Sequence, residues 1–162
     1  MTYDPLELKQ FAQSLLLAAG LPDDKAACVA EVLLEGDLLG HTTHGLALLS
    51  PYLSDIQSGS MQKNGDPLVI SDHPGALLWD GCRLPGPWLV RQAMTVAMAR
   101  ARVNGTCTVV IKRSHHIAWF PQQTNSTDFA VIPRATVTGD RIISETVALF
   151  AQAEEADGQC IA

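Results

Sequence analysis

Apolar residues recur every three to four positions over the first third of the chain, which is the period of an amphipathic helix. The clearest case is the stretch 8–19, whose apolar positions fall on one stripe. Asp4 and Pro5 precede it, and these residue types favour the cap and the first position of a helix. A second helix is predicted over about residues 22–40 and a third over residues 46–56.

The spacing of apolar residues changes after residue 60. Two short apolar runs, residues 67–70 and 76–79, are bounded by turn-forming residues, which is typical of β-strands. A helical pattern returns over residues 86–103, and the β-branched segment 106–112 that follows predicts a buried strand. This order predicts an α/β fold in which N-terminal helices are followed by a mixed sheet with packed helices.

The regular pattern weakens beyond residue 118. Residues 119–127 are polar and aperiodic, and residues 129–137 are compatible with an extended segment that a proline interrupts. Residues 142–156 predict a short amphipathic helix. We therefore divide the chain into residues 1–118 and a divergent, poorly ordered tail, residues 119–162.

Composition narrows the classes of function. The 162 residues are 47% hydrophobic and 17% charged, which is enough apolar material for a core. A net charge of −6 argues against a protein that binds nucleic acid through phosphate contacts. No apolar run approaches the roughly 18 residues that a membrane span needs, and the N-terminus lacks the features of a signal peptide. The four cysteines show no CxxC spacing, so we expect reduced thiols in a cytoplasmic protein.

The histidines carry the candidate chemistry, because imidazole exchanges protons near neutral pH. His41 and His44 lie in a Gly-His-Thr-Thr-His-Gly segment between two predicted helices. Ser114, His115 and His116 follow the predicted strand 106–112, and ligands often bind at the carboxyl ends of strands in such sheets. The pattern alone leaves a structural role open for both groups, as helix-terminal residues and as a surface loop.

Other chemistries find less support in the sequence. His41, His44 and His116 offer three nitrogen donors, but no carboxylate or thiolate lies at ligand spacing, so a metal site is not favoured. There is no G-x-S-x-G elbow, no G-x-G-x-x-G fingerprint and no P-loop. A small histidine-rich metal binder is kept as a third alternative.

Taken together, these motifs resemble the malate/L-lactate dehydrogenase family of the non-Rossmann type. That family includes ureidoglycolate and sulfolactate dehydrogenases and piperideine-2-carboxylate reductases. The resemblance covers about residues 5–118 and corresponds to the N-terminal part of a family member. The segments that carry it are Gly40–Gly45, Pro51–Leu53, Asp80–Gly86, Val109–Ile111 and Ser114–Ile117.

The resemblance implies an NAD- or NADP-dependent oxidoreductase that transfers hydride to or from a 2-hydroxy or 2-oxo acid, or a cyclic imine acid. It implies a non-Rossmann α/β fold and a homodimer. Carried over by position, His116 and His44 are catalytic, with His116 as the acid/base, and Thr43 and His44 bind the substrate. His44, Ser114 and His116 contact the cofactor, and no metal is expected.

The chain departs from the family pattern in two places. Many members have an arginine four residues after the histidine of the Thr-His pair, whereas this chain has Leu48. Losing that arginine removes a charge-assisted contact to a substrate carboxylate worth about 1.5–3 kcal/mol, which favours an imine or a less usual oxo acid. From Trp119 onward nothing resembles the family. We therefore expect a truncated member with an incomplete cofactor site, and the alternative function is a non-catalytic fragment that docks on a partner subunit.

Overall fold

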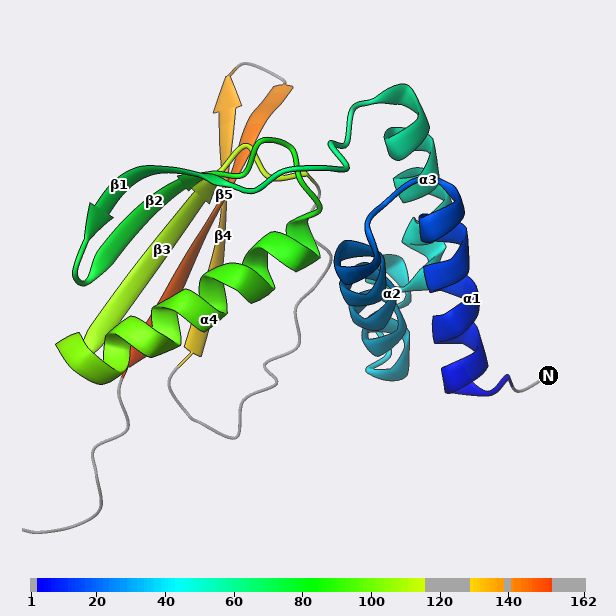
Figure 1. Cartoon of the computed structure of the whole chain (residues 1–162), viewed down its shortest axis with the longest axis horizontal. Coiled ribbons are helices and arrows are strands. Elements are labelled where there is room, and N and C mark those ends of the chain that lie inside the picture. Colours follow the sequence, from blue (N-terminus) through cyan, green and yellow to red (C-terminus); the bar gives the residue numbers. More distant parts are fainter. Residues whose placement is uncertain (1–2, 116–128, 139–140, 153–162) are drawn as a thin grey trace, which may run out of the picture.

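The computed structural model describes residues 3–115, 129–138 and 141–152, with side chains for residues 3–115. The chain forms two lobes (Figure 1). A helical lobe comprises residues 3–58, and a sheet lobe comprises residues 68–115 together with the strands of residues 129–138 and 141–152. Residues 59–67 connect the two lobes.

The helical lobe confirms the predicted helices with small shifts of their ends. It contains α1 (Pro5–Ala18), α2 (Asp23–Leu38), two short 3-10 turns (Thr42–His44 and Leu46–Leu48) and α3 (Leu49–Ser58). Asp4 caps α1 by accepting a hydrogen bond from the Leu6 N–H at 2.7 Å, as the sequence predicts. α3 ends at Gly59, whose φ of 76° lies in the left-handed region that favours glycine.

The core of the helical lobe is an apolar cluster drawn from all three helices. Its buried side chains stabilise the packing of the three helices and the 3-10 turns into one lobe. The largest of them are Leu16, Val29, Val32, Leu33 and Tyr52.

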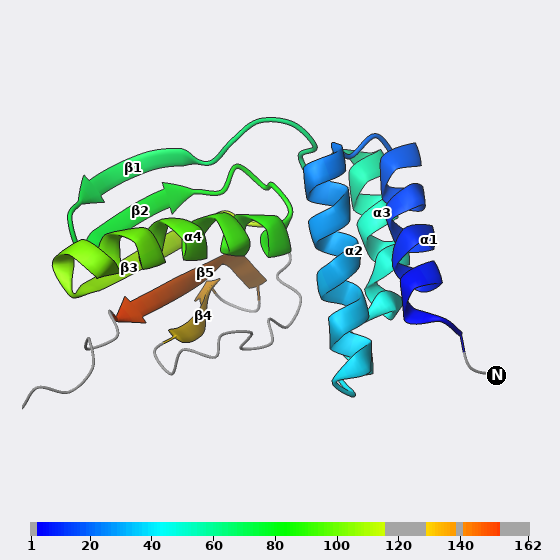
Figure 2. The ribbon, with the colours of Figure 1, turned by 60° about the horizontal axis from the view of Figure 1, so that its bottom comes forward.

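The sheet lobe contains a mixed five-stranded sheet, ordered β1-β2-β3-β5-β4. Its strands are β1 (Leu68–His73), β2 (Ala76–Asp80), β3 (Thr106–Lys112), β4 (Phe129–Thr138) and β5 (Arg141–Gln152). Only β2 and β3 are parallel, and α4 (Gly86–Asn104) makes the crossover between them. α4 lies along one face of the sheet (Figure 2) and buries Trp79, Val109 and Ile111 against Leu89 and Ala93.

The edge strand β1 exposes apolar side chains. Leu68, Val69 and Ile70 are all exposed, and no described residue pairs with the outer edge of this strand. The described helices offer no membrane span, since none of them is long and apolar enough to cross a bilayer.

The predicted helix at residues 142–156 is wrong, because this segment contains the strand β5. β5 pairs with β3, with Val109 opposite Leu149. Its first half is rich in β-branched residues, which favour strands, and the open edge of β3 supplies a partner that a local pattern cannot reveal. The expected extended segment is confirmed as β4, whose place at the sheet edge accommodates Pro133.

Candidate functional site

The turn of residues 40–45, here called the His44 turn, is fixed to the end of α2. The His41 N–H donates to the Gly36 carbonyl at 2.8 Å, and the Leu46 N–H donates to the Asp37 carboxylate at 2.9 Å. Gly45 lies against that carboxylate so closely that a Cβ there would be 1.9 Å from Asp37 Oδ1. Glycine is therefore required at this position for steric reasons.

Thr43 and His44 lie together, as predicted. Thr43 Oγ1 is 3.0 Å from His44 Nδ1, at hydrogen-bonding distance, and this contact orients the imidazole ring. Thr43 is exposed and His44 is half-buried. Leu48, which follows in the next 3-10 turn, packs against the core of the helical lobe.

A second group forms where the parallel strands β2 and β3 end. Asp80 and Lys112 are register neighbours at these carboxyl ends. Beyond them, residues 81–84 and 113–115, here called the strand-end loops, continue to pair. The Gly81 N–H donates to the Lys112 carbonyl at 2.7 Å, and the His115 N–H donates to the Leu84 carbonyl at 3.0 Å. The two loops therefore form one unit at the edge where α/β proteins commonly bind ligands.

Asp80 holds this unit together. Its Oδ1 accepts hydrogen bonds from Arg113 Nε at 2.9 Å and from the Cys82 N–H at 3.0 Å, and its Oδ2 lies 2.7 Å from Arg113 Nη2. Burial by itself would raise the pKa of Asp80, but the hydrogen bonds from Arg113 and Cys82 outweigh burial, so the pKa lies below its ordinary value. The carboxyl group is therefore ionised at neutral pH.

The strand-end loops contain strained backbone. Cys82, Arg83 and Arg113 have φ values of 51°, 59° and 53°, in the left-handed region that residues other than glycine rarely occupy. Such conformations cost about 1–3 kcal/mol each and cluster at functional sites. The arrangement supports a functional role for these loops.

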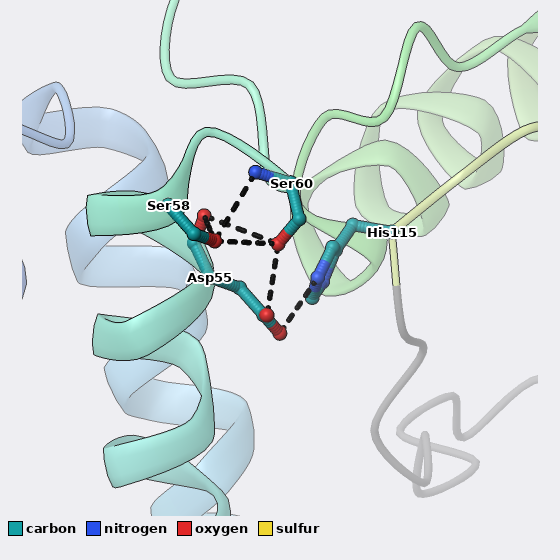
Figure 3. A network of polar contacts seen from close by, with 4 residues as sticks. All are labelled: Asp55, Ser58, Ser60 and His115. Atoms are coloured by element: carbon teal, nitrogen blue, oxygen red, sulfur yellow. Dashed lines mark hydrogen bonds and ion pairs between the residues drawn. The ribbon is translucent and has the colours of Figure 1, made fainter.

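His115 connects the strand-end loops to the helical lobe (Figure 3). Its Nε2 is 3.0 Å from Asp55 Oδ2, near the end of α3. The other oxygen of Asp55 accepts a hydrogen bond from Ser60 Oγ at 2.8 Å, and Ser58 Oγ lies 3.1 Å from Ser60 Oγ. The edge of the His115 ring also packs on Tyr52, with centroids 5.6 Å apart. The His115 imidazole thus links the strand-end loops to α3.

Ser114 has a buried Oγ with no hydrogen-bond partner among the described residues. The residue after His115, His116, lies outside the described residues, so its predicted role as the acid/base stays a prediction. The same holds for its predicted contact with the cofactor.

The structure brings the predicted residues together in two groups, which lie at opposite ends of α3. The His44 turn precedes this helix, whereas Asp55, near its other end, binds His115. At a rise of about 1.5 Å per residue, the segment from Leu46 to Asp55 separates the groups by on the order of 14 Å. Within one chain, the described residues therefore do not form a single cluster.

Sequence reasoning missed the three carboxylates that organise these groups, Asp37, Asp55 and Asp80. Asp80 lies in a segment whose turn was recognised, but its arginine partner is 33 residues away. Asp55 looked like an ordinary polar position on a helix. Among the described residues, no three His, Cys, Asp or Glu side chains gather closely enough to hold a metal ion.

Comparison with known proteins gives a consistent set of matches. The family model described as malate/L-lactate dehydrogenase matches residues 3–130. The L-lactate dehydrogenase of Cupriavidus necator is 33% identical over 109 residues, which cover 67% of this chain and 31% of that protein. The hydroxycarboxylate dehydrogenase B of Escherichia coli O157:H7 is 26% identical over 140 residues, covering 85% of this chain and 39% of that protein.

The fold agrees with these matches. The structure of malate dehydrogenase from Pyrococcus horikoshii OT3 superposes with a TM-score of 0.70 and 28% identity, over 72% of this chain and 33% of that one. The chain thus spans about a third of the length of the relatives that it matches. The predicted α/β class is confirmed, and the matched region extends past residue 118. The chain belongs to the malate/L-lactate dehydrogenase family.

Proposed function

We propose that this chain is part of an oxidoreductase that transfers hydride between NAD or NADP and a 2-hydroxy or 2-oxo acid, or a cyclic imine acid. The observation that carries the proposal is the family match over residues 3–130. The relatives named above are dehydrogenases of lactate and of hydroxycarboxylates. We also propose a cytoplasmic location, which fits the free thiols of Cys28, Cys82 and Cys107.

The strand-end loops fit a nicotinamide cofactor in one respect. The buried Ser114 Oγ lies at the carboxyl ends of parallel strands and has no hydrogen-bond partner among the described residues. A hydroxyl in that position can donate to, or accept from, a ligand atom. When bound, the cofactor supplies or accepts the hydride, and we assign its contacts to Ser114, His44 and His116.

The proposed roles of the remaining residues follow from their chemistry. His116 donates a proton to the substrate oxygen or nitrogen in reduction and accepts it in the reverse reaction. Thr43 and His44 orient the substrate. Because the His44 turn and the strand-end loops lie at opposite ends of α3, a homodimer in which each copy completes the other's site is part of this proposal.

The substrate class follows from Leu48. This side chain packs into the helical lobe and carries no charge for a substrate carboxylate. We therefore favour a cyclic imine acid or a less usual oxo acid over malate and lactate.

Titration of the full chain with NADH and with NADPH, followed by nucleotide fluorescence, tests the proposal. Binding at tens of micromolar, together with oxidation of the cofactor by a panel of oxo and imine acids, is expected. The variant His116→Ala should lose turnover while it keeps most of its cofactor binding, because Ser114 and His44 remain. A wild-type rate in that variant would refute the role of His116.

The alternative function is a non-catalytic fragment that docks on a partner subunit. It is favoured by the share of the relatives that the chain covers, about one third. Absence of binding of either nucleotide at millimolar concentration would exclude the enzyme proposal for this chain and leave the alternative. Sedimentation analysis of the chain alone would then measure its own association.

A further inference from the structure

The two lobes meet through directional contacts between charged and polar side chains. At α4, Lys25 Nζ lies 4.0 Å from the centre of the Trp88 ring, and Glu31 bridges to Arg91 at 3.4 Å. The two apolar clusters stay within their lobes, apart from Cys28 of α2, which joins the cluster of the sheet lobe. The relative placement of the lobes therefore depends on a few specific contacts rather than on a shared core.

The contact between Asp55 and His115 joins α3 to the strand-end loops. Asp55 belongs to α3, and its ring partner follows β3 in the chain. The His115 side chain is 13% exposed and that of Asp55 is 38% exposed, so water screens the pair only in part. Next to it, the Gln62 N–H of the connecting segment donates to the Arg83 carbonyl at 3.0 Å, so the backbone there also joins the lobes.

Asp55 places a carboxylate at hydrogen-bonding distance from the His115 ring. α3 also presents the ring of Tyr52, which packs against the imidazole. In the strand-end loops, the Leu84 carbonyl accepts from the His115 backbone, and the guanidinium of Arg113 is engaged by Asp80. Asp55 Oδ1 accepts a hydrogen bond from Ser60 Oγ, and Asp55 Oδ2 points toward the His115 ring (Figure 3).

We propose that Asp55 and His115 form a pH-sensitive clasp that holds the helical lobe against the strand-end loops and tightens when the imidazole gains a proton. A neutral imidazole donates a hydrogen bond from Nε2 to the carboxylate, in which only the acceptor is charged. An imidazolium adds the attraction between two opposite charges to the same hydrogen bond. The strength of the clasp therefore depends on whether the His115 ring carries a charge opposite to that of Asp55. This inference concerns the junction of the lobes and does not depend on the proposed hydride transfer.

Hydrogen exchange of the full chain, read by mass spectrometry and corrected for intrinsic rates, tests the clasp. The Gln62 N–H bonds from the connecting segment to the strand-end loops, and the His115 N–H bonds within those loops, so peptides that contain them report on the two sides of the clasp. In the wild type, their protection should be roughly fivefold higher at pH 5.5 than at pH 8. Asp55→Asn removes the counter-charge while keeping the shape, and His115→Gln keeps an N–H donor that does not titrate. Both variants should lose the difference between the two pH values.

The matched control is Asp66→Asn, which removes the same charge from an exposed position in the connecting segment. It should keep the wild-type dependence on pH. If Asp55→Asn fails to fold, His115→Gln carries the test by itself. Equal protection at both pH values in the wild type, or an unchanged dependence in His115→Gln, would overturn the proposal.

Discussion

Replacing Gly45 by alanine tests how the His44 turn is built. The new methyl group would lie 1.9 Å from Asp37 Oδ1 and 2.3 Å from its Cγ, far inside any van der Waals contact. The carboxylate must therefore move away and release the Leu46 N–H that it now accepts at 2.9 Å. A hydrogen bond to a charged group contributes about 1.5–3 kcal/mol, so Gly45→Ala should destabilise the helical lobe by about 2–3 kcal/mol.

A double-mutant cycle separates this clash from a general intolerance of alanine. Asp37→Ala removes the hydrogen bond and the obstructing carboxylate together, so adding Gly45→Ala to it should cost less than about 1 kcal/mol more. Asp37→Asn is the matched control, because the amide has the shape of the carboxylate and the clash persists. Urea unfolding followed by circular dichroism measures each free energy of unfolding. Strictly additive costs in the Asp37→Ala background would refute the reasoning.

Three further predictions concern charges and a thiol. Asp80→Asn should cost about 1–2 kcal/mol at pH 7, because the nearly buried carboxylate loses its charge-assisted hydrogen bonds from Cys82 and from the exposed Arg113. The variant should also lose less stability than the wild type as the pH falls below 4. Burial raises the pKa of Cys28 to about 11, so iodoacetamide at pH 8 should modify the half-buried Cys82 well before it. Partial burial would raise the pKa of Glu31, but hydrogen bonds from Arg91 and Lys9 outweigh it and hold the pKa below its ordinary value. The ionised Glu31 therefore stabilises the wild type, and this stability is lost as the pH falls. Arg91→Met should lose less stability between pH 5 and 3.

For each of these three predictions, one measured outcome would contradict it. Equal acid sensitivity of Asp80→Asn and the wild type in thermal unfolding would show that the carboxylate is not held ionised. Faster labelling of Cys28 than of Cys82, measured by mass spectrometry of peptides, would show that Cys28 is accessible. An identical acid-induced loss of stability in Arg91→Met would show that Glu31 gains nothing from its partner.

The sequence predicted the elements up to Lys112 because each of them is determined locally. Asp4 caps α1, Gly59 ends α3, and the β-branched run 106–112 is a strand with the predicted ends. β5 was missed because its apolar residues suit a helix as well as a strand, and its pairing with β3 is a contact between distant segments. Local pattern gives no information on such a partner.

The contacts of the candidate site divide in the same way, into those between chain neighbours and those between distant residues. Thr43 and His44 are neighbours in the chain, so their contact could be expected from the motif alone. Asp55 and His115 are 60 residues apart, and their hydrogen bond exists only because the fold places the end of α3 beside the end of β3. Asp37 shows a third case, since its role depends on the absence of a side chain at Gly45.

The outer edge of β1, which no described residue covers, has a practical consequence for anyone who purifies this protein. An edge strand with exposed Leu68, Val69 and Ile70 is a template on which other extended chains can add. Turbidity and losses on concentration are therefore to be expected before any of the binding or exchange measurements. A lysine in place of Val69 would place a charge on that edge and keep stock solutions clear without touching either group of site residues.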